Sequence, residues 1–485
     1  MTSLLTAAPH LGLIAMMMSL WHLIPLSVSV GFGDGAWQAF AFSMLLNSAV
    51  GLGLWLATRR HRRALTPRDG ILIVVLAWCG GAAFATVPLL MTIPGLSFTD
   101  AYFETVSGLT TTGATVLSNL DTLEPSVNVW RCLLVWLGGM GLIVLVVAIL
   151  PILGVGGRQI FKAETPGPMK DSSLTPRITE TAKGLWVVYG AISVACATGY
   201  WLAGMSGLDA VLHTFSTMGL GGFSSHDASF GYWDSPAIEA VSIFFMLLAG
   251  INFGTHFIAV RSRSLSPYRM DGELRPYLLV TVASCIVCAG YLFLMGTYES
   301  FPTALRHASF NLVSIATTTG FASVDYNQWP IFVPIWMLFL CSFVSCSGST
   351  GGGIKMIRAQ VLYSQVYREF IRLLHPNALA PVKLNDQVVE NKIVLAVLSF
   401  MFLYVCSIVS MTLIMTGSGL DIITAFSAVV ACINNTGPGL NQVGPATTFA
   451  VLSDFQTWVC SFAMMLGRLE LFTFIVVFTP VFWRK

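Results

Sequence analysis

The sequence predicts an all-α integral membrane protein in which two N-terminal helices precede four fused helical repeats. Two observations favour this fold class. Of the 485 residues, 55% are hydrophobic and only 10% are charged, whereas soluble domains carry roughly 25% charged residues. The second observation is a polar segment, "LTTTGA" at 109–114 and "ATTTGF" at 316–321, that recurs between long apolar stretches. One structural unit is therefore expected to be used several times.

Ten apolar stretches are long enough to cross a bilayer, which takes about 20 helical residues. They lie at 10–31, 36–57, 71–92, 132–154, 184–205, 237–260, 278–296, 331–347, 393–415 and 455–482. The first has no basic segment before it and no small-residue cleavage site, so we expect a retained helix and not a signal peptide. The ten cysteines fall in or beside these stretches, which predicts small buried residues more than redox or metal chemistry.

Basic residues predict the orientation of the spans. Of the 25 Lys and Arg residues, 22 lie at the C-terminus and in the segments 58–68, 157–183, 261–275 and 355–392. Only Arg306 lies in the loops on the opposite side, which are 93–130, 206–236, 297–330 and 416–454. The positive-inside rule places the basic segments in the cytoplasm, and an even number of spans then puts both termini there. The basic residues face membrane lipid and imply no nucleic-acid partner.

Each outer loop holds a half-apolar segment of about 12 residues, which is too short to cross and indicates a re-entrant helix. A glycine follows each segment, at Gly113, Gly222, Gly320 and Gly437. Twelve positions before each glycine stands an alanine, at Ala101, Ala210, Ala308 and Ala425. Successive glycines are 98–117 residues apart. Each copy therefore reads as span, pore loop and span, and four fused copies can close a pseudo-fourfold pore from one chain.

The polar glycine loops indicate which ion the predicted pore binds. Non-helical backbone at membrane depth is tolerated where it lines a water-filled path, and its carbonyl oxygens can replace an ion's hydration shell. Glycine supplies the positive φ that points successive carbonyls the same way. No Asp or Glu lies within the four tetrads, and uncharged oxygens favour a monovalent cation over Ca²⁺. Tight packing turns between helices are the alternative, but they do not readily explain four copies in register.

The arrangement resembles the Trk/Ktr/HKT superfamily of potassium transporters, and within it the bacterial TrkH-type subunits. The resemblance covers essentially the whole chain and is carried by "TTTGA" (110–114), "TTTGF" (317–321), "INNTGPG" (433–439) and "SCSGSTGGGIK" (345–355). It implies K⁺ sites at Thr111, Thr112, Leu220, Gly221, Thr318, Thr319, Asn435 and Thr436. The copies depart from the TVGYG signature of potassium channels, so fewer strong sites and less stringent K⁺/Na⁺ selection are expected.

The resemblance also implies a function and partners. The chain is expected to conduct K⁺ inward across the bacterial inner (cytoplasmic) membrane, with K⁺ bound in the filter and no organic cofactor. A homodimer and a cytoplasmic ring of nucleotide-binding TrkA-type subunits are implied as well. A symporter that couples K⁺ to Na⁺ or H⁺ is the alternative within transport, although carriers more often show inverted repeats.

No catalytic constellation in the sequence indicates an enzyme, and a non-conducting sensor is the alternative from another class. "GSTGGGIK" at 348–355 lacks the spacing of a phosphate-binding loop. Residues 345–353 read "SCSGSTGGG", and glycine costs a helix about 1 kcal/mol per residue. We therefore expect an intramembrane gating loop there; close helix packing is the alternative. Its gating glycines are Gly348, Gly351, Gly352 and Gly353.

Three charged residues carry further expectations. Arg468 stands near the middle of the last span, where arginine is costly and usually functional, so we expect it to donate to carbonyls of the gating loop; a structural salt bridge is the alternative. Lys355 is expected to mark the cytoplasmic end of its span. Glu104 is the only acid nine residues before an anchor glycine. Three roles are open for Glu104: it raises the cation concentration near the pore entrance, it stabilises the filter, or it makes an ordinary hydrogen bond within the pore helix.

These expectations divide the chain into five parts. The two N-terminal helices occupy 1–68. The four repeats follow at 69–170, 171–275, 276–390 and 391–485, and the third contains the gating loop.

Overall fold

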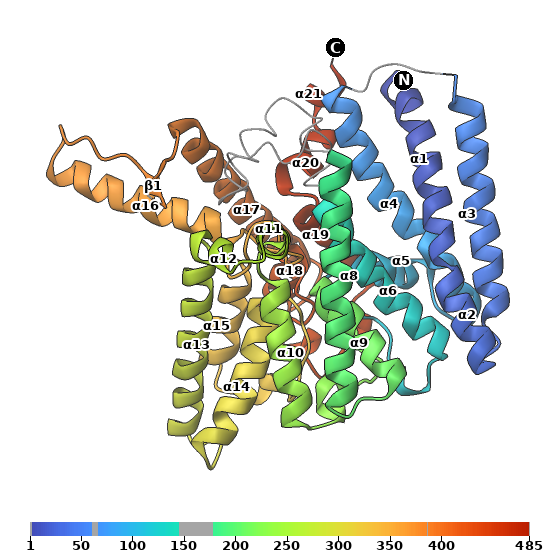
Figure 1. The fold of residues 1–485 in the computed structure, drawn as a ribbon, viewed down its shortest axis with the longest axis horizontal. Coiled ribbons are helices and arrows are strands. Elements are labelled where there is room, and N and C mark those ends of the chain that lie inside the picture. Colours follow the sequence, from blue (N-terminus) through green and yellow to red (C-terminus); the bar gives the residue numbers. More distant parts are fainter. Residues whose placement is uncertain (1, 61–65, 145–177, 386, 485) are drawn as a thin grey trace.

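A computed structural model describes residues 2–60, 66–144, 178–385 and 387–484 of the chain. Within these residues the fold is helical, and its only strand pairing is the short antiparallel hairpin of β1 (Lys383–Leu384) and β2 (Gln387–Val388). The all-α prediction is therefore confirmed. Long helices stand side by side, and the described parts near the two termini lie at the same end of the molecule (Figure 1).

Three N-terminal helices precede the repeats: α1 (Thr2–Trp21), α2 (Leu23–Phe32) and α3 (Trp37–Thr58). The first two form one stretch of 29 residues, Leu4–Phe32, that is apolar and long enough to cross a membrane. Gly12 and Gly51 let α1 and α3 approach closely, because a Cβ on Gly12 would lie 2.6 Å from the carbonyl oxygen of Gly51. Small residues at such crossings are typical of helices packed in lipid.

Each repeat places a short pore helix between an outer and an inner helix. The first repeat has α4 (Pro67–Thr92), α5 (Phe98–Leu109) and α6 (Pro125–Val144). The second has α8 (Ile178–Leu202), α9 (Gly207–Gly219), α10 (Pro236–Ala249), α11 (Phe253–Ser262) and α12 (Ser266–Met270). The third has α13 (Leu274–Leu294), α14 (Phe301–Ala316), α15 (Phe332–Cys341) and α16 (Met356–Leu374). The fourth has α17 (Asn391–Gly417), α18 (Ile422–Ile433), α19 (Asp454–Arg468), α20 (Leu471–Ile475) and α21 (Pro480–Trp483).

Short 3-10 turns complete the outer loops and the C-terminal segment. They are η1 (Leu120–Thr122), η3 (Ser229–Tyr232), η4 (Tyr326–Gln328), η5 (Asn441–Val443), η6 (Phe449–Val451) and η7 (Val476–Phe478).

Among the described residues, six helical stretches are long and apolar enough to span a membrane, and two more spans are bent. The bends are 91° between α10 and α11 and 119° between α19 and the segment Leu471–Phe478. α15 has only ten residues. The spans predicted at 237–260, 331–347 and 455–482 are therefore not continuous helices: the first and third are bent, and only 332–341 of the second is helical. The predicted span 132–154 lies partly outside the described residues.

Local backbone chemistry accounts for the two bends. After α10, the Asn252 side chain accepts a hydrogen bond from the Gly254 N–H (2.8 Å) and so starts a new helix as its N-cap. After α19, Glu470 adopts a left-handed φ of 60°, which a right-handed helix excludes. Neither break was predicted from the sequence, because no glycine cluster marks them: the first contains one glycine, Gly250, and the second, Leu469 and Glu470, contains none.

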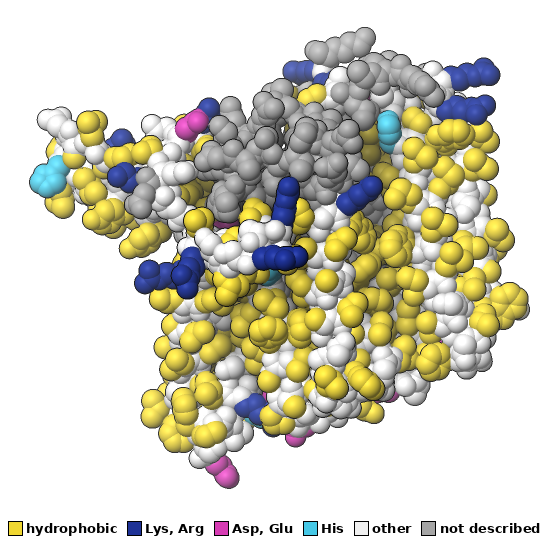
Figure 2. Space-filling view, in the orientation of Figure 1, with side chains coloured by type: hydrophobic (Ala, Val, Ile, Leu, Met, Phe, Trp, Pro, Cys, Tyr) yellow, Lys and Arg dark blue, Asp and Glu magenta, His cyan; other side chains and the backbone are white. Residues whose placement is uncertain are grey.

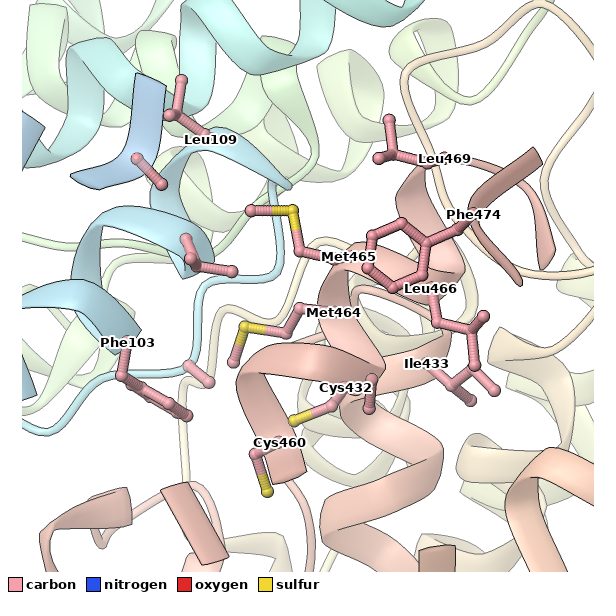
Figure 3. Close-up of a cluster of buried hydrophobic side chains, with 14 of the residues drawn as sticks. Phe103, Leu109, Cys432, Ile433, Cys460, Met464, Met465, Leu466, Leu469 and Phe474 are labelled. Atoms are coloured by element: carbon pink, nitrogen blue, oxygen red, sulfur yellow. The ribbon is translucent and has the colours of Figure 1, made fainter. Parts of the chain in front are cut away.

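Two large apolar cores join the repeats in pairs. One core includes residues of the N-terminal helices, the first repeat and the fourth, and the other belongs mainly to the second and third repeats. In the first core, Met464 and Met465 of α19 lie between Phe103 and Leu109 of α5 and the fourth repeat's own helices (Figure 3). The end of the chain thus packs against the first repeat, and the four repeats close into a ring.

The outer surface is that of a protein embedded in lipid. Hydrophobic side chains cover most of the face seen in Figure 2, while Lys and Arg gather in its upper half and several Asp or Glu lie at the lower edge. An apolar flank with basic residues concentrated towards one end is the pattern of a multi-pass membrane protein.

Candidate ion-conduction site

Four pore helices begin at capped residues in the outer loops. The caps are Ser97, Ser206, Ser300 and Asp421, and each side chain accepts a hydrogen bond from the backbone N–H three residues later. This bond satisfies one of the N–H groups that a helix start leaves open. The opposite ends of the helices lead into the filter segments, which we define as 110–113, 219–222, 317–320 and 434–437. Four helix C-termini, each with a partial negative charge, therefore converge there.

The pore helices all end in the same way. A residue two positions before each anchor glycine takes a left-handed φ: 56° at Thr111, 53° at Leu220, 64° at Thr318 and 55° at Asn435. Its N–H, and that of the next residue, fold back onto the last helical turn. In the first repeat these bonds are Thr111 N to Gly108 O (2.9 Å) and Thr112 N to Ser107 O (2.8 Å), and the other three repeats have equivalent pairs. This pair of hydrogen bonds at the helix end is the Schellman motif.

The anchor glycines then turn the chain outward. Gly113, Gly320 and Gly437 have φ of 80°, 94° and 95°, as the glycine argument predicts. Gly222 is the exception, since it is not among the left-handed residues. It is nonetheless required to be small, because a Cβ there would lie 2.6 Å from the carbonyl carbon of Gly320.

Contacts among the anchor glycines close a ring. A Cβ on Gly113 would lie 2.6 Å from the Gly222 nitrogen, and one on Gly222 would meet Gly320. A Cβ on Gly320 would strike the Thr436 carbonyl oxygen, and one on Gly437 would lie 2.8 Å from the Thr112 oxygen. The order first, second, third, fourth and first again is that of a closed four-membered ring.

The eight residues predicted from the sequence as ion ligands are brought together in this ring. All of their Thr and Asn side chains are fully buried, and Asn435 donates to the Thr112 hydroxyl across the contact between the fourth and first repeats (3.0 Å). The ring itself offers backbone carbonyls, hydroxyls and an amide, with no formal charge. Across the described residues, no cluster of three or more His, Cys, Asp or Glu side chains suits a metal ion, so the oxygen-lined ring is the candidate cation site.

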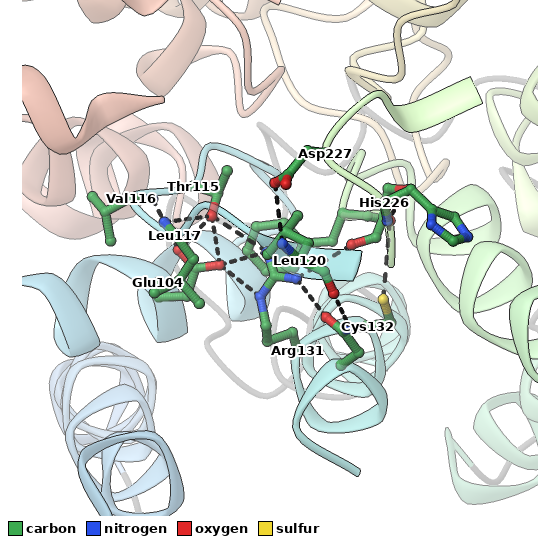
Figure 4. A network of polar contacts seen from close by, with 12 residues as sticks. Glu104, Thr115, Val116, Leu117, Leu120, Arg131, Cys132, His226 and Asp227 are labelled. Carbon is green, nitrogen blue, oxygen red and sulfur yellow. Dashed lines mark hydrogen bonds and ion pairs between the residues drawn. The ribbon is translucent and has the colours of Figure 1, made fainter. Parts of the chain in front are cut away.

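Glu104 holds the strand just beyond the first filter segment, from outside the ring (Figure 4). Its carboxylate accepts from the Val116 N–H (3.1 Å) and the Thr115 hydroxyl (3.0 Å), and it pairs with Arg131 at 2.7 Å. Both charged side chains are at most 1% exposed. The reading in which Glu104 attracts cations is therefore wrong, because its charge is buried and neutralised. The reading in which it steadies the filter fits these contacts.

Equivalent braces occur in the other repeats with different chemistry. His213 contacts the Ser224 hydroxyl (2.9 Å), Asn311 contacts Ser323 (3.0 Å), and Ser427 accepts from the Leu440 N–H (2.8 Å). In every repeat the pore helix thus holds the strand two or three residues beyond its own glycine. Arg131 was missed as a site residue, although an isolated arginine and the only acid at its register were the signal that could have paired them.

A hollow of about 200 Å³ leads to the ring from the side of the outer loops. All four anchor glycines line it, together with Arg131, His226 and Asp227. His226 joins the outer loops of the first two repeats through contacts with Asp121 and Asp209.

The intramembrane loop, residues 342–355, lies against the C-terminal ends of the pore helices. The Thr350 hydroxyl donates to the Met218 carbonyl of the second repeat (2.9 Å), and the Gly352 N–H donates to the Thr318 hydroxyl of the third (2.8 Å). A Cβ on Gly351 would lie 3.1 Å from the Thr317 oxygen. The predicted non-helical loop is confirmed, and its glycines allow this close approach.

Arg468 holds the loop through backbone oxygens. Its guanidinium donates to the Thr350 carbonyl (2.9 Å) and to the Gly138 carbonyl of the first repeat (2.8 Å). The predicted contact with loop carbonyls is confirmed, and Glu470, the acid nearest to Arg468 in the sequence, pairs with Arg358 instead (2.7 Å).

The expectation for Lys355 fails. It is buried, with φ of 77°, and its ammonium donates to the Gly351 carbonyl within the loop. The Lys355 ammonium binds an acceptor inside the protein and does not reach the membrane interface. Lys355 is therefore not a snorkelling anchor.

The model of the TrkH family, described as a cation transport protein, matches residues 36–485. The chain belongs to the TrkH family. It is 44% identical over 475 residues to the Trk system potassium uptake protein TrkH of Salmonella typhimurium, and the match covers 98% of both chains. It is 37% identical over 486 residues to the Trk system potassium uptake protein TrkG of Escherichia coli, and that match covers 100% of both.

A solved TrkH structure has the same fold. The crystal structure of the potassium transporter TrkH from Vibrio parahaemolyticus matches with a TM-score of 0.91 at 41% identity, covering 100% of this chain and 99% of that one. The expected architecture of N-terminal helices and four span–pore-loop–span repeats around a pseudo-fourfold pore is therefore confirmed, and the TrkH-family chain is a multi-pass membrane protein.

The first prediction concerns Gly113. Replacing Gly113 with Ser should weaken discrimination between K⁺ and Na⁺, because the new Cβ strains a left-handed backbone and meets Gly222 at 2.6 Å. Gly95→Ser is the matched control, since Gly95 also has a left-handed φ (77°) but no atom within 4 Å of its Cβ position. The measurement is the K⁺/Na⁺ flux ratio in liposomes. Equal ratios for wild type and Gly113→Ser would show that the first filter segment does not select ions.

The second prediction concerns the Glu104–Arg131 pair. Glu104→Gln should lower the free energy of unfolding by about 3 kcal/mol, because Arg131 is left buried without its counter-charge. The double variant Glu104→Gln, Arg131→Met should recover part of that loss, as thermal unfolding in detergent can measure. The ratio of mutant to wild-type K⁺ flux should be the same at low and high ionic strength. A ratio that approaches one at high salt would instead indicate attraction of ions through solvent.

Proposed function

We propose that the chain takes up K⁺ across the membrane through the ring of four filter segments, with one pore per chain. The observation that carries the proposal is the fourfold recurrence of a left-handed residue at the pore-helix end, in a ring that closes through its glycines. Uncharged oxygens at four converging helix C-termini suit a weakly hydrated monovalent cation. Relatives named as potassium uptake proteins support the choice of ion.

The proposed K⁺ ligands are the two residues before each anchor glycine. The Schellman bonds use the N–H groups of these residues. Of their carbonyl oxygens, those of Thr319 and Gly221 accept from the N–H groups of Gly222 and Phe223, and the other six accept no backbone N–H among the described residues. Thr111, Thr112, Thr318, Thr319 and Thr436 add hydroxyl oxygens, and Leu220 and Gly221 add backbone alone. The second repeat therefore contributes the fewest oxygens, which favours modest selection of K⁺ over Na⁺.

The intramembrane loop is the proposed gate. It packs against pore-helix ends of three repeats and carries the Arg468 contact, so it obstructs the path on the side of the ring away from the outer hollow. The positive charge of Arg468 adds an electrostatic barrier to a cation at that level. Gly348, Gly351, Gly352 and Gly353 give the loop the freedom to move aside.

The gate is proposed to open from the cytoplasm. α16 continues directly from the loop and protrudes from the body of the molecule (Figure 1), so a partner that holds α16 can pull the loop. A TrkA-type nucleotide-binding subunit fits this role in a protein of the TrkH family, and a homodimer in the bacterial inner membrane with both termini cytoplasmic is proposed with it. The repeat boundaries are proposed near the predicted ones, 69–170, 171–275, 276–390 and 391–485, and the boundary at 170 lies outside the described residues.

Flux through the purified protein in liposomes tests the proposal. A K⁺ gradient alone should drive flux, and added Na⁺ or H⁺ gradients should change it only through the membrane potential. A flux that requires either gradient would replace conduction by symport. Absence of K⁺ flux from a well-folded protein under all gradients, with the gate opened by substitution, would overturn the proposal.

The third prediction concerns Arg468→Ala, the substitution expected to open the gate. Loss of two charge-assisted hydrogen bonds to Thr350 and Gly138 should raise K⁺ flux at least about tenfold in protein without any partner, since even one such bond contributes about 1.5–3 kcal/mol. Arg306→Ala is the control, because Arg306 is paired with Glu239 on the outer side of the molecule. Each variant must elute as a single species of wild-type size. Unchanged flux from a well-folded Arg468→Ala protein would contradict a gate held by Arg468.

A further inference from the structure

The intramembrane loop has a narrow neck where the chain enters and leaves it. A single carboxylate oxygen, Oε2 of Glu273, accepts hydrogen bonds from the Ser347 N–H (2.9 Å) and the Ile357 N–H (3.1 Å). Ser347 lies on the entering limb, and Ile357 is the second residue of α16. Just inside these bonds the Met356 N–H donates to the Ser345 carbonyl (2.8 Å). Glu273 therefore ties the two limbs together.

Glu273 is supplied by a different part of the chain, the cytoplasmic turn before α13. This turn is itself held to its surroundings. Asp271 accepts from the Glu273 N–H (3.0 Å) and from the Thr255 hydroxyl (2.8 Å), and the Gly272 carbonyl accepts from Gln360 of α16 (3.1 Å). The carboxylate is thus carried on a fixed corner that reaches both the loop and α16.

The Glu273 side chain is fully buried, and its other oxygen, Oε1, has no hydrogen-bond partner. Burial raises the pKa of Glu273 to about 8, and Asp271 raises it further, while the two N–H bonds and the charge of Lys355 act in the opposite direction. The titratable groups that interact with it are Asp271 on the same turn and Cys346 and Lys355 in the loop. His256 on α11 and Tyr277 on α13 lie one step further out, beside Asp271 and Cys346 respectively.

We propose that Glu273 is a second latch on the intramembrane loop, a positioning residue that closes its neck and makes the closed loop sensitive to cytoplasmic pH. The inference rests on the proposed gate and extends it, because Arg468 holds the tip of the loop from the fourth repeat. Glu273 holds the base from the turn between the second and third repeats.

The direction of the pH effect follows from linkage. A carboxyl with a raised pKa binds its proton more tightly in the closed neck than in an opened, hydrated neck, where its pKa returns toward about 4.3. Rising pH therefore destabilises the closed loop over the interval from that value to about 8. Flux should be lowest in acid and should increase as the pH rises toward 8.

The experiment measures K⁺ flux in liposomes without any partner, with the same pH on both sides, from pH 6 to 8.5. Glu273→Ala removes the acceptor for two buried N–H groups and should raise flux at pH 7 about tenfold. Glu273→Gln keeps an oxygen acceptor and resembles the protonated carboxyl, so its flux should stay at the low level that wild type shows in acid, and its pH response should be lost. Glu299→Gln, an exposed acid in an outer loop, should leave both flux and pH response unchanged.

Arg468→Ala in the same assay separates the possible failures. If Arg468→Ala raises flux while well-folded Glu273→Ala does not, the latch is overturned and the gate remains. If Glu273→Gln keeps the wild-type pH response, the link between Glu273 and pH is overturned. If wild type and all variants fail to conduct K⁺, the proposed function fails and the latch fails with it. A Glu273→Ala protein that elutes as aggregate leaves the decision to Glu273→Gln, whose flat pH profile is still required.

Discussion

Backbone that leaves a helix inside a membrane must find its hydrogen bonds within the protein. The four filter segments meet this constraint with one device, a left-handed residue that returns two N–H groups to the last turn of the pore helix. The device costs roughly 1–2 kcal/mol for each non-glycine residue in that conformation. The two hydrogen bonds use only N–H groups of the filter segments. The conformation depends on neighbouring segments, which pack against the anchor glycines and so form the ring. The conformation of each repeat therefore depends on the other three.

The braces outside the ring show how the repeats diverged under that constraint. Each pore helix must fix the strand beyond its own glycine, and a carboxylate, an imidazole, an amide and a hydroxyl all do so. Among the four braces the first is the charged one, and there a buried arginine, Arg131, pairs with the bracing residue. Arg131 satisfies Glu104 and also contacts the Ser224 carbonyl of the second repeat (3.3 Å). The charged brace of the first repeat therefore also links that repeat to the second, through Arg131.

The sequence was sufficient to predict features that recur in register and polar residues that stand within an apolar span. Four glycines in register predicted four pore loops, and a mid-span arginine beside a glycine cluster predicted the contact from Arg468 to Thr350. Features that depend on the local path of the folded backbone were not predictable. Lys355 looked like an interfacial lysine because its acceptor, the Gly351 carbonyl, exists only once the loop has folded back. The breaks after α10 and α19 were hidden because an Asn that caps a new helix, as Asn252 does, and a Glu with a left-handed φ, as Glu470 has, look like ordinary helix residues in the sequence.

Interruption of the inner helix in three repeats explains how one loop can act on a ring of four. A continuous inner helix would pass the ring along its outside, as α6 does where Gly138 lets it approach the Leu109 carbonyl. A broken helix instead brings its backbone to the ends of the pore helices. The third repeat has the longest break, and its loop reaches the second, third and fourth pore-helix ends at once. Arg468 extends that contact to the first repeat through Gly138, so displacement of the loop changes the support of every filter segment together.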